Sequence, residues 1–248
     1  MPGWGIDDGV KNTMLWTANG NHPLVAAEMA RKNIYYLHGA PGSPMYLTIR
    51  KGKDPITSVA DFKGLQVRGF GYQAIWAEQL GMIPSFMPVS EAYEALQKGI
   101  IDASGFSMSG IFYKKSYEVV DQLIAPSIRV GGGGGMPAQI NLDTWNSMPK
   151  YMQDLWAEAI AEAAAYGAKL NEVSIAAGRK AGEDNGMTFV KLSPEESNKM
   201  LMAIGPAWEK WVADTENQKG GEKIREYIKD SIAQRDKITG EKWMIYQP

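Results

Sequence analysis

The sequence predicts an α/β fold with a largely parallel sheet. Between residues 24 and 103, short runs of β-forming residues alternate with segments of good helix formers. Such alternation is typical of strands joined by crossover helices, which makes neighbouring strands parallel. From residue 149 onward the pattern becomes helical. Together, the two patterns indicate an α/β sheet followed by a group of helices.

The first elements are a helix and three strands. Leu24–Lys32 is rich in alanine, a strong helix former. Ile34–His38 and Met45–Arg50 carry apolar and β-forming residues and are predicted strands. The stretch 39–44 between them holds two glycines and two prolines, which end the first strand. The third strand is predicted at Leu65–Arg68.

The middle of the chain continues the alternation. Ser90 suits the N-cap of a helix, and Gly99 suits its end. The predicted elements are a helix over Tyr72–Leu80, an extended segment over Ile83–Pro88, a helix over Glu91–Lys98 and a short strand over Ile100–Ala103.

The C-terminal part is predicted to contain one unusually long helix, from Pro149 to Glu183. Ser193 and Pro194 then form a capping signal for a helix that runs toward Asp214. A last helix is predicted over residues 221–235. The apolar residues of the long helix that fall near period 3.6 are Met152, Leu155, Trp156, Ala159, Ile160 and Ala163.

Composition excludes several classes of protein. The chain has 248 residues, 44% of them hydrophobic and 22% charged, which is ordinary for a globular protein. The net charge of -2, with no basic block, argues against nucleic-acid binding. Cysteine is absent, and His22 and His38 are not at metal-ligand spacing. We therefore expect no metal site, no cofactor and no nucleic-acid partner.

Arg68 is the most specific chemical signal. It follows the predicted strand at 65–67 and precedes Gly69-Phe70-Gly71. Its planar guanidinium can bind a carboxylate with two parallel hydrogen bonds. The alternative is a surface arginine paired with Asp61 or Glu78, which spacing alone favours because exposed ion pairs are common.

The block around Arg68 resembles a known family. It is similar to the solute-binding, DctP-type component of tripartite ATP-independent periplasmic (TRAP) transporters. That resemblance implies a periplasmic-binding-protein type II-like fold, with two lobes, a hinge and a long C-terminal helix that spans them. The matching residues, whose spacing is kept throughout, are Asp61–Arg68, Leu80–Pro84, Met87–Tyr93, Ala95–Asp102 and Tyr117–Val119.

The resemblance implies that Arg68 binds the carboxylate of a small organic acid between the lobes. Phe106 stands where many members have a polar asparagine, so it either stacks on an apolar or aromatic acid or packs in the core. Pro44 stands where some members have a second arginine. These two departures favour a monocarboxylate. The other residues that we place at the predicted site are Phe70, Ser90, Ser104, Ser107, Ser43 and Gly131.

The run of five glycines at 131–135 lacks the spacing of a phosphate-binding loop. Its backbone could approach a ligand closely, or it could be a plain connection, which we favour. Trp4, Asp7 and Asp8 are further residues that could lie near the site.

The expected domains are residues 1–42 as the remainder of lobe 1 and the hinge, and 43–125 as lobe 2, an α/β ligand-binding domain. Residues 126–248 are expected to form the hinge return, the long spanning helix and C-terminal helices that pack on lobe 1. No leader is visible at Met1, and the resemblance begins part-way into the family's sequence. We therefore expect a late start, with self-association through an incomplete lobe 1, whose unpaired strand edges invite another chain.

The expected function is that of a periplasmic receptor in bacteria, which delivers a small organic acid to TRAP membrane permease subunits. We expect no enzymatic activity, because no nucleophile with a base and no metal set is visible. Two alternatives stay open: a ligand-sensing ectodomain, and an enzyme such as a hydrolase that uses the same cleft.

Overall fold

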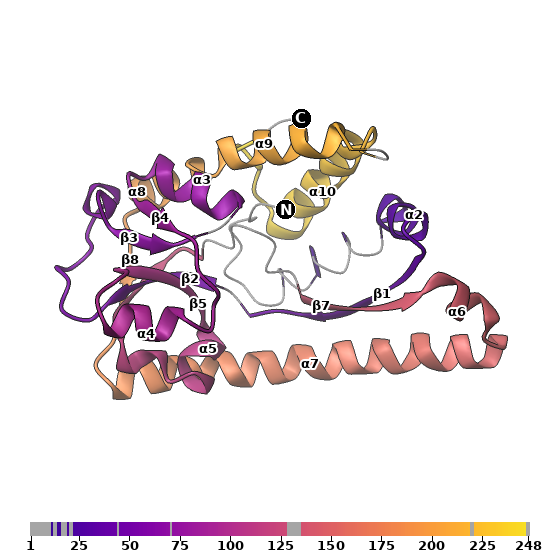
Figure 1. The fold of residues 1–248 in the computed structure, drawn as a ribbon, viewed down its shortest axis with the longest axis horizontal. Helices are drawn as coiled ribbons and strands as arrows, with labels where there is room; N and C mark the ends of the chain where they lie inside the picture. Colours follow the sequence, from indigo (N-terminus) through magenta and orange to yellow (C-terminus); the bar gives the residue numbers. More distant parts are fainter. Residues whose placement is uncertain are drawn as a thin grey trace. The chain divides into compact units, whose positions relative to one another are not determined.

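The computed structural model describes residues 11, 14, 15, 19, 22–43, 45–69, 71–127, 135–218 and 221–246, with the backbone alone at 38–41, 135 and 136. The chain divides into two compact units (Figure 1). Unit 1 contains residues 43–127 and 173–213 of the described chain, and unit 2 contains residues 11–42, 135–172 and 214–246.

Unit 1 is built on a six-stranded sheet, whose strands are ordered β4-β3-β5-β2-β6-β8. The strand bounds are β2 Met45–Arg50, β3 Gln66–Arg68, β4 Ile83–Ser85, β5 Ala103–Ser107, β6 Val120–Ala125 and β8 Thr188–Lys191.

The sheet of unit 1 is largely parallel, as predicted, except that β2 runs opposite to the other five strands. Strand β2 runs antiparallel to both β5 and β6, whereas β3 is parallel to β4 and β5, and β6 is parallel to β8. The run Tyr46–Ile49 of β2 is buried, as befits a central strand. A strand buried in this way has the same apolar pattern in either direction, so the sequence could not reveal its polarity.

Helices pack on this sheet, and α4 and α5 share a cluster of buried apolar side chains with it. The core cluster lies over α4, β5, α5 and β6 and includes Leu96, Ile101 and Ile111, all fully buried. The helical elements of this region are η1 Val59–Phe62, α3 Tyr72–Gln79, α4 Ala92–Gln97, α5 Met108–Tyr113, η2 Ser116–Glu118 and α8 Pro194–Met202.

The middle of unit 1 differs from the prediction at the start of α4 and at the following strand. Helix α4 is capped at Glu91 rather than Ser90, and no side-chain hydrogen bond caps it. The strand expected at Ile100–Ala103 begins only at Ala103 and runs to Ser107. Gly99 does end the helix, with φ of 71°, a left-handed conformation that glycine adopts at little cost.

Unit 2 contains a two-stranded antiparallel sheet, β1 Ile34–Pro41 with β7 Gly135–Asn141. Around it lie α2 Pro23–Arg31, α6 Leu142–Ser147 and α10 Ile224–Thr239. The rings of Tyr35 and Trp145 stack at 3.8 Å, which ties β1 to α6. His22 caps α2, since its Nδ1 accepts from Leu24 N–H, and its Nε2 lies 3.0 Å from Asp230 Oδ2 of α10.

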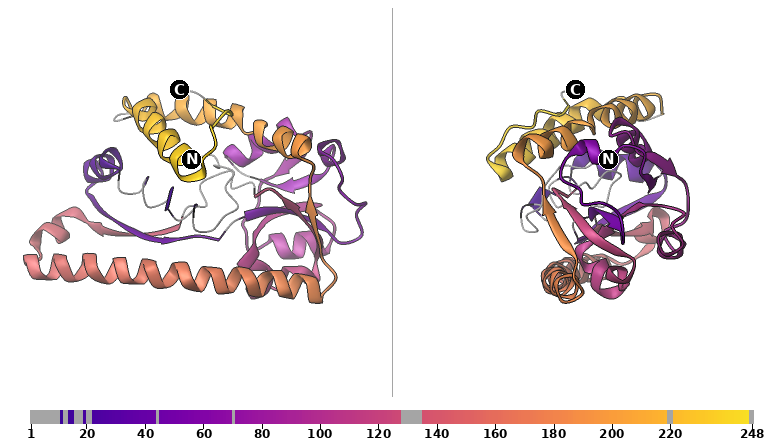
Figure 2. Two further views of the ribbon diagram at one scale, coloured as in Figure 1. Left: turned by 180° about the vertical axis from the view of Figure 1, so that it is seen from behind. Right: turned by 90° about the vertical axis from the view of Figure 1, so that its left-hand side faces the viewer.

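The predicted long helix is confirmed as α7, Lys150–Asp184, an unbroken helix of 35 residues (Figure 2). Ser193 caps α8, with Pro194 in its first turn, also as predicted. The helix expected to run toward Asp214 is instead two helices, because α8 ends at Met202 and α9 covers Gly205–Glu216.

The expected boundary at residue 43 coincides with the start of unit 1. Residues 173–213 belong to that same unit, so α8 and β8 pack with residues 43–127. The expected lobe ranges remain a proposal. Within the described residues, none of the helices combines the length and the apolar character needed to cross a membrane.

Candidate functional site

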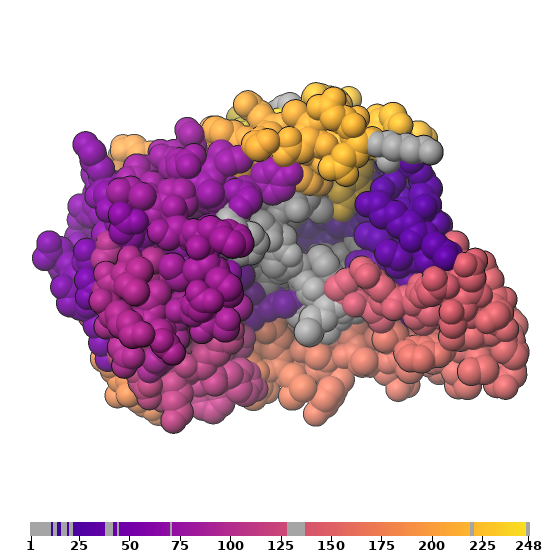
Figure 3. Space-filling model, in the orientation of Figure 1, coloured from indigo at the N-terminus to yellow at the C-terminus, as the bar shows by residue number. Residues whose placement is uncertain are grey.

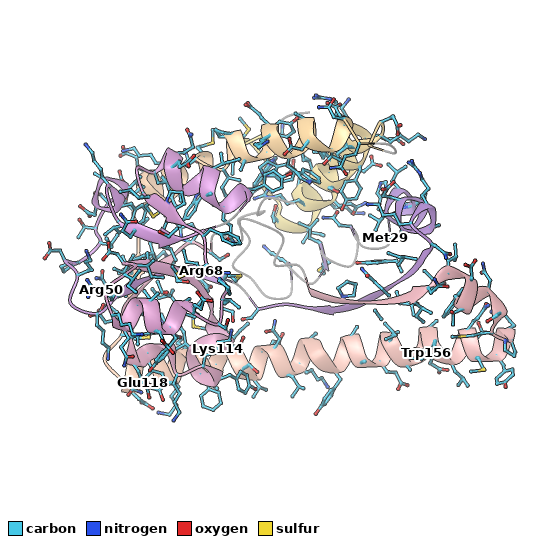
Figure 4. The ribbon with its side chains drawn as sticks, viewed as in Figure 1. Met29, Arg50, Arg68, Lys114, Glu118 and Trp156 are labelled. Carbon is cyan, nitrogen blue, oxygen red and sulfur yellow. The ribbon has the colours of Figure 1, made fainter. Side chains whose placement is uncertain are left out.

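One edge of the unit 1 sheet gathers several of the predicted residues. Arg68 pairs with Ser85, which places the ends of β3 and β4 side by side. Met45 pairs with Ser107, so the start of β2 meets the end of β5. Figure 4 shows Arg68 at this edge, whereas Arg50 lies at the opposite edge. Open α/β sheets commonly bind ligands at the carboxyl ends of their strands, next to the point where the order of the strands reverses.

Arg68 is half-buried at the end of β3. Its Nε donates to the carbonyl oxygen of Met87 at 3.1 Å, which orients the guanidinium. Burial lowers the pKa of Arg68 from its ordinary value, although an arginine in a protein stays protonated. A partly desolvated, oriented cation of this kind is suited to bind a carboxylate.

The alternative of a surface ion pair receives little support. The carboxylate of Asp61 accepts from the backbone N–H groups of Thr57 and Ser58, both at 2.8 Å. These bonds lower the pKa of Asp61 and hold its carboxylate against the backbone of Thr57 and Ser58. Glu78 is exposed on α3.

Helix α3 begins four residues after the end of β3. Its N-cap is Gly71, with φ of 53°, and no side-chain hydrogen bond caps it. The N-terminus of a helix carries partial positive charge and attracts anions. The start of α3 therefore adds to the positive character of the Arg68 edge. The glycine pair around position 70 could have indicated this feature from the sequence.

Two of the predicted serines lie at the same edge. Ser43 is half-buried two residues before β2, and its buried Oγ has no hydrogen-bond partner among the described residues. Ser107 ends β5 and caps α5, because its Oγ accepts from Gly110 N–H at 3.0 Å. Its Oγ also lies 3.2 Å from that of Ser109. Ser43 thus has unused hydrogen-bonding capacity, whereas Ser107 already serves the fold.

Ser104 and Phe106 lie within a strand, although the predicted strand ended at Ala103. Both are in β5, where Ser104 is fully buried and Phe106 is 5% exposed. Phe106 belongs to the core cluster, which favours the alternative that it is a packing residue. The Oγ of Ser104 is buried without a hydrogen-bond partner in the described part of the chain. The strand starts three residues later than predicted, and this shift places Ser104 and Phe106 inside it.

The remaining predicted residues are not gathered at this edge. Ser90 is exposed in the turn before α4. Phe70 and Gly131 lie outside the described residues, as do Pro44, Trp4, Asp7, Asp8 and residues 132–134 of the glycine run. Their assignment to the site stays a prediction.

The sequence reasoning missed Phe86 and the Met87 carbonyl. Phe86 directly follows the Ser85 that pairs with Arg68, and it is 82% exposed. An exposed aromatic ring next to the carbonyl that holds Arg68 is available for an apolar part of a ligand. The signal was the proline-rich segment 84–88, which we interpreted only as extended chain.

Charged side chains at the opposite edge form a structural cluster. Asp102 accepts from Gln66 N–H and lies 2.8 Å from Lys53 Nζ and 3.5 Å from Arg50. Burial raises the pKa of Asp102, but the bonds to Lys53, Gln66 and Arg50 outweigh it, and the pKa is lowered. Over the described residues, no group of three or more His, Cys, Asp or Glu side chains is placed to hold a metal ion.

The family model of DctP, described as bacterial extracellular solute-binding protein, family 7, matches residues 13–215. The chain belongs to this family. The resemblance that the block around Arg68 indicated is therefore confirmed.

A similar protein is the C4-dicarboxylate-binding periplasmic protein DctP of Rhodobacter capsulatus. It is 29% identical over 151 residues, which cover 60% of this chain and 44% of the relative. The chain spans about half the length of the curated relatives it matches.

Solved TRAP periplasmic solute-binding proteins share the fold. One from Ochrobactrum anthropi has a TM-score of 0.79 and 20% identity, covering 97% of this chain and 71% of that one. Another, from Desulfovibrio salexigens with bound orotic acid, has a TM-score of 0.77 and 19% identity, covering 96% and 74%. These likenesses confirm the periplasmic-binding-protein type of α/β fold.

Proposed function

We propose that this chain is the ligand-binding part of a TRAP-type solute receptor, and that it binds a small organic acid through the carboxylate. The observation that carries the proposal is Arg68. It is a half-buried cation, oriented by Met87, at the strand-end edge of a solute-binding fold. A charge-assisted hydrogen bond to such a group contributes roughly 1.5–3 kcal/mol.

The names of similar proteins support the chemical class. The Rhodobacter capsulatus relative is named for C4-dicarboxylate binding, and the Desulfovibrio salexigens structure holds orotic acid. Both ligands are carboxylic acids. For this chain we propose a carboxylate with an apolar portion, because the exposed Phe86 directly follows Ser85, the strand partner of Arg68.

The proposed physiological role follows from the family. The chain would act in the periplasm of a bacterium and present its ligand to the TRAP membrane subunits. The ligand would leave chemically unchanged, since binding and release need only hydrogen bonds and apolar contacts at this edge.

A thermal-shift screen of organic acids, followed by calorimetry, tests the proposal. The panel should contain aromatic and aliphatic monocarboxylates, C4-dicarboxylates, and the matching amides as uncharged controls. A true ligand at 100 times its dissociation constant stabilises the chain by about 2.7 kcal/mol.

We expect stabilisation by one group of acids, none by their amides, and loss of binding in Arg68→Ala. Stabilisation by the amides as strongly as by the acids, or unchanged affinity in Arg68→Ala, would contradict the proposal.

A further inference from the structure

Two aromatic rings and two lysines lie side by side at the end of helix α5 in unit 1. Phe112 is 47% exposed and Tyr113 is 70% exposed, and their rings meet edge to face with centroids 5.2 Å apart. Lys114 and Lys115, which follow directly, are exposed as well. The surface of this part of unit 1 is seen in Figure 3, and Figure 4 labels Lys114 at the end of α5. We call these four residues the α5 patch.

The α5 patch is held in place by its own unit. The hydroxyl of Tyr113 lies 3.1 Å from the hydroxyl of Ser174 on α7. At the other end of α5, the backbone of Met108 packs so closely on Gly178 of α7 that a Cβ there would clash. An exposed aromatic surface on a fixed support loses little conformational freedom when it contacts a partner.

The positive charge of the α5 patch is not neutralised within the described part of the chain. Neither Lys114 nor Lys115 forms an ion pair there, whereas Lys98 and Lys180 each lie within reach of an acid one helical turn away. The next acid along the chain, Glu118, accepts from the hydroxyl of Tyr93 at 2.5 Å. The patch therefore presents two free ammonium groups to an anionic partner.

The backbone at Lys115 points in the same direction. Its φ is 48°, a left-handed conformation that glycine or asparagine adopts more easily than lysine. Local structure therefore does not favour a lysine at this position. Residues held in such conformations concentrate at functional sites.

A membrane surface matches the chemistry of the α5 patch. Aromatic rings settle at the level of lipid headgroups, and lysine side chains extend their carbon stems over apolar surface while the ammonium reaches the phosphates. A bound peptide would instead need an unpaired strand edge or a groove, and the patch lies at a helix end, outside the strands of the described residues. We propose that the α5 patch docks this chain on a membrane that contains anionic phospholipids.

Flotation of the full chain with lipid vesicles tests the proposal. We expect binding to vesicles that mix phosphatidylglycerol with phosphatidylcholine, and much weaker binding to phosphatidylcholine alone. The double variant Lys114→Gln, Lys115→Asn should lower the partition coefficient on the anionic vesicles roughly thirtyfold, which corresponds to about 1 kcal/mol per lysine. Asparagine is used at position 115 because it tolerates the left-handed backbone.

A matched variant controls for net charge. Lys63→Gln, Lys191→Gln removes the same charge from two other exposed positions of unit 1 and should leave the partition coefficient nearly unchanged. Phe112→Gln keeps both lysines and should weaken binding about tenfold, because the ring no longer enters the headgroup layer. Thermal unfolding of each variant checks that the chain stays folded. No organic acid is needed in these measurements, so their outcome is independent of binding at Arg68.

Absence of binding to the anionic vesicles would overturn the proposal. Equal binding to both lipid compositions would also overturn it, as would an equal loss in the two double-lysine variants, because the charge of the α5 patch would then have no specific role. Binding of polyglutamate through Lys114 and Lys115, without binding to vesicles, would show that an acidic polypeptide is the partner instead of a membrane.

Discussion

Arg68 donates to a backbone carbonyl, and this contact determines what a substitution should do. Nε donates to Met87 and orients the guanidinium plane. Lysine keeps the positive charge but has no planar group that can donate to a carbonyl and to a carboxylate at once.

We therefore predict that Arg68→Lys weakens binding of the identified acid about tenfold or more, measured by calorimetry, while the chain stays folded. Arg31→Lys is the control, because Arg31 is an exposed residue of α2 in unit 2. Equal affinities in Arg68→Lys and the unsubstituted chain would show that the anion is bound elsewhere.

The charge of Asp102 supports the unit 1 sheet. Its carboxylate accepts from Gln66 N–H of β3 and contacts Lys53 and Arg50, and its pKa is lowered in the folded chain. A lowered folded-state pKa means that the ionised form stabilises the fold above the unfolded pKa. That contribution is lost as the pH falls through the lowered folded pKa.

We predict that Asp102→Asn reduces the free energy of unfolding by about 1–3 kcal/mol at neutral pH. The loss should shrink in acid, because the unsubstituted chain then loses the same charge. Urea unfolding at several pH values measures this. Asp154→Asn, which alters an exposed pair with Lys150, should have little effect at any pH. A constant difference from neutral to acid pH would count against the ionic role of Asp102.

At the scale of elements, the part of α7 that belongs to unit 1 packs closely against α5 at Gly178. A Cβ added at Gly178 would lie 1.9 Å from the carbonyl oxygen of Met108, the first residue of α5. In most helices, replacing glycine by alanine stabilises by about 1 kcal/mol. Here the backbone of α5 would have to move away.

Gly178→Ala is therefore predicted to destabilise unit 1 by about 1–3 kcal/mol, despite the higher helix propensity of alanine. Thermal and urea unfolding provide the measurement. Ala176→Gly, at an exposed position of the same helix, should cost only about 1 kcal/mol from propensity. Stabilisation by Gly178→Ala would mean that α7 and α5 are not in close contact in solution.

At the scale of the whole molecule, the two units differ in how much structure supports their strands. The sheet of unit 1 has six strands among the described residues, and a cluster of buried apolar side chains packs on it. The sheet of unit 2 has two strands among its described residues. Two strands alone are marginally stable in water unless other elements cover them.

Amide hydrogen exchange should report this difference. We predict slower exchange in the central strands β2, β5 and β6 of unit 1 than in β1 and β7 of unit 2, because the former open only with the core. Equal protection of β1 and β2 would show that unit 2 is as stable as unit 1.

The sequence determined the features that depend on local chemistry. Ser193 with Pro194 marked the start of α8, Gly99 marked the end of α4, and the apolar run Met45–Arg50 marked β2 with its bounds. Arg68 was identified as a carboxylate-binding candidate from side-chain chemistry and the family resemblance. These signals act within a few residues, so they can be recognised without a partner.

Only the tertiary structure decided the features that depend on distant neighbours. The direction of β2, the burial of Phe106 and the Met87 carbonyl that orients Arg68 each require another strand or loop to be in place. The long helix α7 shows the same limit, since its apolar periodicity predicted a helix but not that Leu155 and Trp156 would be exposed. Periodicity gives a side chain's position around its own helix, whereas burial depends on what packs against that face.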